Sequence, residues 1–224
     1  MTQTAFLFDL DGTLIDSVYQ HVLAWHDALR SEGIDLPVWL IHQRIGMSDG
    51  LIVKEFLRIA AIPSDAALTK RLIGAHGEAY KALAASVKPL PGAKALLDSL
   101  DARHMPWAIA TSSDLAGARP NLAALDLDPG AIVLVTREEA DLSKPDPDLF
   151  IQAAGKLGVG TGGTVVVGDS QWDMLAAARC GALGVGLLCG GNGADDLRRS
   201  GAIRLYSDPG ALLDNLSELA PTVV

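Results

Sequence analysis

A four-residue apolar run near the N-terminus, Ala5–Phe8, leads directly into Asp9 and Asp11, which are separated by one leucine. A short, continuous apolar run is typical of a strand buried on both faces, as strands of parallel sheets are. Side chains two positions apart on an extended chain point the same way, with Cα atoms roughly 6–7 Å apart. Both carboxylates can therefore reach one small group beyond the strand end, and their repulsion requires a proton on one of them or a cation between them. An ordinary strand ending in an Asp-Gly turn fits the same pattern.

The chain after Pro91 alternates short apolar runs with segments of helical periodicity. The runs predict strands at 107–110, 131–135, 164–167, 183–187 and 203–205. Helices are expected around Leu96 and at 115–125, 146–157, 170–179 and 211–219. Pro120 is expected to break the helix over 115–125, because proline lacks the N–H that continues a helix. Alternation of this kind is typical of a doubly wound α/β fold with a parallel sheet.

The segment 16–88 differs from the rest, because its apolar residues follow helical spacing without β-branched runs. One helix face is formed by residues four, three and four positions apart, namely Val18, Val22, Trp25 and Leu29. Pro89 and Pro91 then interrupt the helical pattern. The sequence therefore predicts an α/β core built from 1–15 and 89–224, with a small helical cap domain at 16–88 inserted after the first strand.

Composition and charge exclude several classes of partner. The 224 residues are 49% hydrophobic, which allows a sizeable core, yet no apolar run approaches the length of about eighteen that a membrane span needs. A net charge of −9 argues against a nucleic-acid partner. The N-terminus shows no basic region with a cleavage site, and two cysteines make no disulfide framework. We expect a cytoplasmic, soluble protein with no membrane partner.

Polar residues follow three further predicted strands. The hydroxyls of Thr111–Ser113 precede a helix, where free amides favour an anion, although simple N-capping fits too. Lys144 can hold a phosphoryl oxygen or lie in solvent. Asp169, with Asp173 one helical turn later, offers the oxygen ligands of a hard cation, or a helix cap. Because the carboxyl ends of parallel strands meet at one edge, these residues are expected to face one ligand.

This ordered set resembles the four motifs of the haloacid dehalogenase-like (HAD) hydrolase superfamily. The corresponding residues are Asp9–Thr13, Thr111-Ser112, Lys144-Pro145 and Gly168–Asp173. The resemblance covers nearly the whole chain, because the family places a small C1-type helical cap directly after its first motif. It also implies that the strands ending at the first, second and fourth motifs lie side by side.

The resemblance implies phosphoryl transfer that depends on Mg²⁺. Asp9 would be the nucleophile and form an aspartyl-phosphate. Asp11 would protonate the leaving oxygen and then activate water. The ion would be held by the Asp9 carboxylate, the backbone carbonyl of Asp11 and Asp169, with Asp173 helping through water.

The same resemblance assigns the phosphate site. Thr111, the amide of Ser112 and Lys144 would neutralise the transferring oxygens, since positioning and electrostatics supply most of the rate in phosphoryl transfer. Gly12, in the turn after the two aspartates, is assigned to phosphate binding as well. The substrate is expected to be a small phosphorylated metabolite.

Two residues of the segment 16–88 are candidate substrate contacts. His21 is expected to contact Asp11 or the substrate, with helix packing as the alternative. Arg44 lies where a cap loop would close over the site, so it is a candidate contact for the remote end of the substrate, and a surface position is equally compatible with the sequence.

Three enzyme activities of the superfamily compete. A phosphatase that hydrolyses a small phosphate monoester is favoured, and a dehalogenase is disfavoured because that branch lacks the second aspartate. A β-phosphoglucomutase-like phosphomutase is the rival, since Asp16–His21 resembles the start of its cap. However, the mutase-like cap turn carries an arginine where this chain has Asp49, and the mutase also has an acidic residue where this chain has Gly168 in its fourth motif.

A non-enzymatic phosphosensor resembling a receiver domain is a remote alternative. Receivers also combine aspartates, a hydroxyl, a lysine and Mg²⁺ on a doubly wound sheet, but they carry no inserted cap. The sequence leaves the substrate open among phosphoglycolate, a sugar phosphate, a polyol phosphate and a nucleotide. A monomer is expected because many proteins of this family are monomers.

Overall fold

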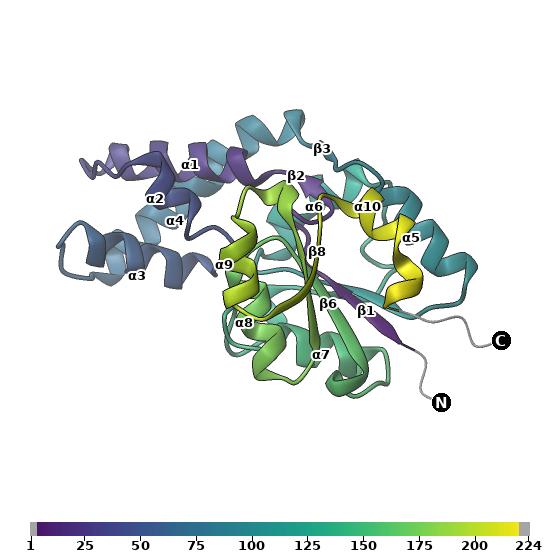
Figure 1. Cartoon of the computed structure of the whole chain (residues 1–224). Helices are drawn as coiled ribbons and strands as arrows, with labels where there is room; N and C mark the ends of the chain where they lie inside the picture. Colours follow the sequence, from purple (N-terminus) through teal and green to yellow (C-terminus); the bar gives the residue numbers. More distant parts are fainter. Residues whose placement is uncertain (1–3, 220–224) are drawn as a thin grey trace.

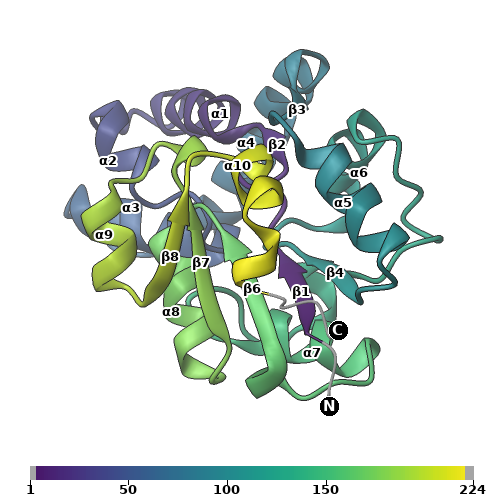
Figure 2. The same cartoon turned by 45° about the vertical axis from the view of Figure 1, so that its right-hand side comes forward.

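A computed structural model describes residues 4–219 and shows a six-stranded sheet covered by helices on both faces (Figure 2). The strand order is β5-β4-β1-β6-β7-β8, and every neighbouring pair is parallel. The strands are β1 (Ala5–Phe8), β4 (Trp107–Ala110), β5 (Leu134–Val135), β6 (Thr164–Gly168), β7 (Leu183–Leu187) and β8 (Ala202–Tyr206). The predicted α/β class is therefore confirmed.

The side chains of β1 alternate between the two faces of the sheet, as an extended strand requires. Phe6 and Phe8 join one buried cluster, and Leu7 joins the other. The first face is covered by α5 (Ala93–Ala102), α6 (Leu115–Ala124) and α10 (Pro209–Asp214). The second face is covered by α7 (Asp148–Lys156) and α8 (Gln171–Arg179), while α9 (Ala194–Arg199) packs beside β7 and β8.

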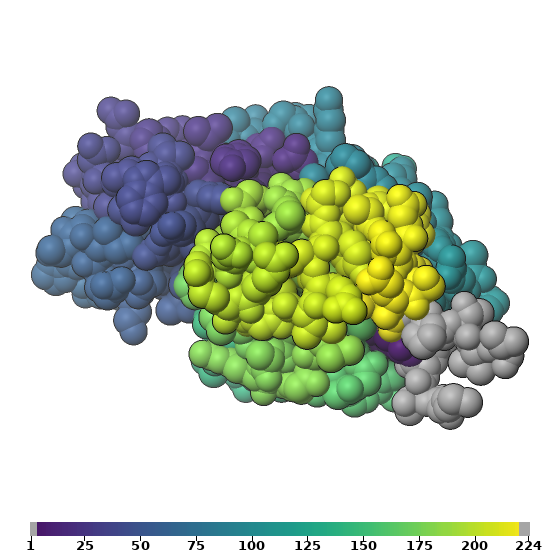
Figure 3. All heavy atoms as spheres, viewed as in Figure 1, coloured from purple at the N-terminus to yellow at the C-terminus, as the bar shows by residue number. Residues whose placement is uncertain are grey.

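Along the chain, four helices, α1 to α4, come between β1 and the next strand of the sheet, β4. We call these four helices the helical insertion. These helices are α1 (Val18–Ser31), α2 (Val38–His42), α3 (Asp49–Ile59) and α4 (Ala66–Leu83). They lie beyond one end of the sheet (Figures 1 and 3). They bury a cluster of their own, which includes Trp25, Phe56 and Leu72. The chain enters and leaves through an antiparallel ribbon of β2 (Ile15–Asp16) and β3 (Lys88–Pro89).

Three expected elements differ from the structure. The helix over 115–125 is not broken, since α6 continues through Pro120. Packing holds it together, because Asn121 and Leu122 are fully buried and the Asp114 side chain accepts a 2.8 Å hydrogen bond from the Gly117 amide. The strand expected at 131–135 is shorter, because β5 is an edge strand that pairs with β4 at two positions only. The last helix divides into α10 and a 3-10 turn, Leu216–Glu218.

The remaining short elements are 3-10 turns at Ala84–Ser86, Arg137–Glu139, Thr161–Gly163 and Leu188–Gly190. Across residues 4–219, no helix combines the length and the hydropathy that crossing a membrane requires.

Candidate functional site

Three predicted site residues lie at adjacent strand ends. Asp9 follows β1, Thr111 follows β4 and Asp169 follows β6, and β1 lies between the other two strands. The Asp9 amide donates a 2.9 Å hydrogen bond to the carbonyl of Val167, which continues the sheet to its edge. All three side chains are buried. Parallel pairing thus brings Asp9 together with residues 102 and 160 positions later in the chain.

Lys144 reaches the same edge from the segment before α7. Its side chain is fully buried, forms an ion pair with Asp9 and places Nζ 2.8 Å from Oδ1 of Asp173. The ring of Phe150 lies 5.0 Å from Nζ. Burial alone would lower the pKa of Lys144, but Asp173 and Asp9 outweigh burial and raise it. Lys144 is therefore a fixed cation between two carboxylates, not a solvent lysine.

The carboxylates of Asp9, Asp169 and Asp173 form one buried acidic group, whose nearest oxygens lie within 4.8 Å of one another. Burial, together with Asp173 and Asp11, raises the pKa of Asp9 to about 7 although Lys144 opposes this. Burial and the neighbouring Asp173 and Asp9 also raise the pKa of Asp169. Three buried carboxylates beside one lysine leave an excess of negative charge. A divalent cation with a preference for oxygen ligands fits this donor set.

Glycines allow the backbone to approach these carboxylates closely. Gly12 has a φ of +85°, and a Cβ there would lie 2.5 Å from Oδ2 of Asp169. A Cβ on Gly168 would lie 2.4 Å from the Cβ of Asp173, which is itself held by a 2.6 Å hydrogen bond from the Ser170 hydroxyl. The glycines of the first and fourth motifs are therefore required by space, and Gly12 is required by its backbone conformation as well.

The Asp11 side chain is not part of this acidic group, and its hydrogen-bond partners come both from the helical insertion and from the part of the chain that contains the sheet. Its Oδ1 accepts hydrogen bonds from Ser17 Oγ at 2.6 Å and Asn121 Nδ2 at 2.6 Å, and His21 Nε2 lies 3.3 Å away. Burial alone would raise the pKa of Asp11, but His21 and Ser17 outweigh burial and lower it. In this arrangement Asp11 is an ionised carboxylate, able to accept a proton.

A polar chain behind Asp11 was not found from the sequence. Asn121 is fully buried, and its Oδ1 accepts a 2.9 Å hydrogen bond from the Tyr80 hydroxyl of α4. The His21 ring stacks on the Tyr80 ring with centroids 3.9 Å apart, and its Nδ1 lies 3.2 Å from Nε2 of His76. The one sequence signal that could have indicated these polar contacts is an asparagine next to a leucine on a helix face that is expected to be buried.

A cavity of about 330 Å³ lies between the strand ends and the helical insertion. Its floor contains Asp9, Asp11 and the three residues Thr111–Ser113. The opposite wall comes from the insertion and is largely apolar, with Trp25, Ile45, Met47, Ile52 and Ile73. Apolar walls with a few convergent polar groups are typical of small-molecule sites.

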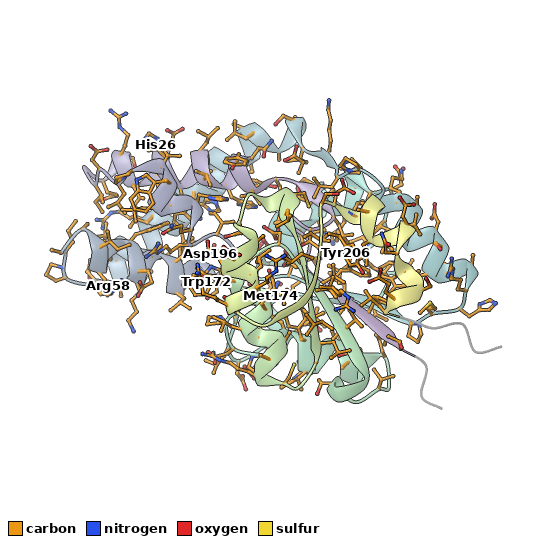
Figure 4. The ribbon with its side chains drawn as sticks, viewed as in Figure 1. His26, Arg58, Trp172, Met174, Asp196 and Tyr206 are labelled. Atoms are coloured by element: carbon orange, nitrogen blue, oxygen red, sulfur yellow. The ribbon has the colours of Figure 1, made fainter. Side chains whose placement is uncertain are left out.

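The loop before α3 lies along one side of this cavity and contacts the part of the molecule that contains the six-stranded sheet, which we call the sheet-bearing part. The Ser112 hydroxyl donates a 3.0 Å hydrogen bond to the carbonyl of Gly46. A Cβ on Gly46 would lie 2.8 Å from Ser170 Oγ and 3.1 Å from Trp172, so the loop passes directly over the start of α8. Figure 4 shows Trp172 at this boundary between the two parts of the molecule.

The candidate residues from the helical insertion have different positions. His21 lines the cavity, and its Nε2 lies 3.3 Å from Oδ1 of Asp11. Arg44 is not among the described residues that line the cavity, and its guanidinium donates a 2.8 Å hydrogen bond to Oε1 of Gln43. Arg44 is half-buried. Of the residues in this loop, Ile45 and Met47 line the cavity, whereas Arg44 does not.

Comparison with known proteins gives consistent results. The family model described as haloacid dehalogenase-like hydrolase matches residues 3–181. The chain is 35% identical over 196 residues to hexitol phosphatase A of Escherichia coli strain K12, which covers 80% of this chain and 82% of that protein. It is 34% identical over 176 residues to a phosphoglycolate phosphatase of Xylella fastidiosa strain 9a5c, covering 78% and 76% of the two chains.

A solved structure of a hydrolase from Pseudomonas syringae is also similar. It superposes with a TM-score of 0.96 at 49% sequence identity and covers 97% of this chain and 100% of its own. The similarity therefore includes the helical insertion as well as the sheet.

Proposed function

Because the chain belongs to the haloacid dehalogenase-like hydrolase family, we propose that it is a Mg²⁺-dependent phosphatase that hydrolyses small-molecule phosphate monoesters. The observation that carries this proposal is Asp9, buried between Lys144 and two further carboxylates at the floor of a small cavity. In the same proposal, 16–88 is the cap domain, 1–15 and 89–224 form the catalytic core, and the enzyme acts as a cytoplasmic monomer.

The first step begins with attack by a carboxylate oxygen of Asp9 on phosphorus. The bond between phosphorus and the ester oxygen breaks, and that oxygen takes a proton from Asp11 to leave as an alcohol. Asp11 is held ionised by its hydrogen bonds, so it must first take up a proton from solvent as the substrate binds. Lys144, Thr111 and the Ser112 amide hold the transferring oxygens and offset their charge.

The second step returns Asp9 to its starting form. Asp11, again a carboxylate, removes a proton from water, and the water oxygen attacks phosphorus. The bond between phosphorus and the Asp9 oxygen then breaks, and inorganic phosphate leaves. The hydrogen bonds from Ser17 and Asn121 favour the carboxylate form of Asp11 that this step needs.

The proposed ligands of the ion are the Asp9, Asp169 and Asp173 carboxylates with the Asp11 backbone carbonyl. When bound, Mg²⁺ supplies positive charge that lowers the repulsion between these carboxylates and an incoming phosphate. The excess of buried negative charge around Asp9 supports such an ion.

A phosphomutase is less well supported by this site. An acidic residue in place of Gly168 would bring its Cβ to within 2.4 Å of the Cβ of Asp173, which is too close for both side chains to fit. In this chain the fourth motif is instead built around a glycine that leaves Asp173 next to Lys144.

Phosphate release from a panel of small phosphate esters tests the proposal. We expect release that needs added Mg²⁺, is lost on chelation, and falls at least about a thousandfold in Asp9→Asn, because removing a nucleophile forfeits the covalent route. The control is Asp98→Asn, the same change at an exposed position of α5. Conversion of a sugar 1-phosphate to its 6-phosphate without release would support a mutase. Stable phosphorylation without turnover would support a phosphosensor.

A further inference from the structure

The cavity wall opposite the strand ends carries one acidic residue without a partner. Three acidic residues line the cavity away from Asp9 and Asp11, namely Asp49, Glu78 and Asp114. Glu78 lies 2.6 Å from Nζ of Lys81, and both side chains are largely exposed. Asp114 caps α6 and lies 3.5 Å from Arg137. Among residues 4–219, no hydrogen bond or ion pair reaches the Asp49 side chain.

Among the described residues, no cation that lines the cavity forms an ion pair with Asp49. Lys81 is already paired at the rim. Burial, followed by the nearby His21, lowers the pKa of His76 well below its ordinary value, so this imidazole is neutral at pH 7. Burial raises the pKa of Asp49 and outweighs the attraction from Arg137, outside the cavity lining, and from His21, within it, while Asp114 repels Asp49.

Asp49 is also held in place. It is the first residue of α3, directly after the loop whose Gly46 carbonyl accepts the hydrogen bond from Ser112. Its neighbours along the wall are the apolar side chains of Met47 and Ile52. A group bound at the strand ends and extending into the cavity therefore meets apolar surface and a single carboxylate that has acceptor capacity and no donor.

We propose that Asp49 selects the alcohol part of the substrate, favouring one that is uncharged or cationic and donates hydrogen bonds, and rejecting one that carries a carboxylate or a second phosphate. This inference rests on the proposed phosphatase function and names the substrate class of that same site. The preferred substrates are thus phosphate esters of polyhydroxylated or amino alcohols.

The physical basis is the cost of placing a second anion beside Asp49 in a partly buried site. Like charges that approach within a few ångströms repel strongly at low effective dielectric, whereas a hydroxyl or ammonium group gains a charge-assisted hydrogen bond. The apolar wall can pack against the carbon atoms of an anionic alcohol and of an uncharged one equally well, so it does not distinguish the two. Discrimination by charge consequently depends on Asp49.

The test compares glycerol 3-phosphate with 3-phosphoglycerate, two esters of the same length in which a hydroxymethyl group replaces a carboxylate. For the natural enzyme with Mg²⁺, we expect kcat/KM to favour glycerol 3-phosphate by about tenfold or more. Asp49→Asn should reduce this preference by about tenfold, mainly through a lower KM for 3-phosphoglycerate. Asp35→Asn, the same change at an exposed position of the helical insertion, should leave the preference unchanged.

Two results would overturn the inference while leaving the phosphatase intact. The first is hydrolysis of 3-phosphoglycerate as fast as, or faster than, glycerol 3-phosphate by the natural enzyme, a comparison that needs no variant. The second is an unchanged preference in a folded Asp49→Asn. Failure to hydrolyse any ester of a wider panel, including p-nitrophenyl phosphate, would instead remove the proposed function and this inference with it.

Discussion

At the scale of single residues, the site depends on glycines that let the backbone approach the buried carboxylates closely, and on charged side chains that pair with those carboxylates. Gly168 shows this most directly, because it precedes the Asp169 carboxylate and faces the Asp173 side chain. Asp173 in turn contacts both Ser170 and Lys144. A change of one methyl group at position 168 therefore acts on the lysine that pairs with Asp9.

Gly168→Ala should lower both activity and stability. Its Cβ would lie 2.4 Å from that of Asp173, so Asp173 must move away from Lys144. Overpacking of this kind costs about 1–3 kcal/mol in the free energy of unfolding. Thermal unfolding and phosphate release measure the two effects. Gly155→Ala is the matched control, because a Cβ there meets nothing within 4 Å and alanine favours a helix. Equal effects of the two substitutions would contradict this account.

At the scale of elements, the helical insertion is held by the packing of α1 against α4. His76 of α4 stacks on Trp25 of α1 with ring centroids 4.1 Å apart, and it also lies beside His21. This buried imidazole, whose pKa is lowered mainly by burial, makes the helix pair sensitive to acid.

The contribution of His76 to the free energy of unfolding should therefore decrease as pH drops below about 6.5, the ordinary pKa of histidine, because in that range the unfolded chain binds a proton that folded His76 does not. Asp9 and Asp169, whose pKa values are raised, contribute in the opposite sense, so the effect of His76 is measured as a difference. In denaturant unfolding at several pH values, the free energy of unfolding of the natural protein should decrease with falling pH relative to that of His76→Phe. The same substitution at His26, which is partly exposed, is the control. An identical pH dependence in His76→Phe and the natural protein would contradict the assignment.

The elements themselves were largely predictable, because the apolar runs of the central strands β1, β4 and β6 are almost entirely buried between the two layers of helices. The exceptions have local causes that pattern alone does not contain. Pro120 stays inside α6 because burial of Asn121 and Leu122 supports that helix. The strand around Leu134 is short because it pairs with its one neighbour, β4, at two positions only.

At the scale of the whole molecule, the site residues that could be predicted are those at strand ends, since a parallel sheet brings Asp9, Thr111 and Asp169 together. The partners of Asp11 could not be predicted in the same way. Asn121 and Tyr80 meet only because α6 of the sheet-bearing part and α4 of the helical insertion pack around one carboxylate. Spacing within one element carries no information about such contacts.

The central claim is that phosphate passes through Asp9, and trapping the phosphorylated protein tests it most directly. Asp11→Asn removes the base of the second step, and p-nitrophenyl phosphate has a leaving group that needs no proton from Asp11 in the first. Acid quenching during turnover of this ester should therefore leave one phosphoryl group on the peptide that contains Asp9. Mass spectrometry of that peptide measures the gain, and hydroxylamine should remove it. The double variant Asp9→Asn with Asp11→Asn should show no gain. Steady hydrolysis by the natural enzyme with no phosphoryl group on Asp9 in any variant would contradict the account.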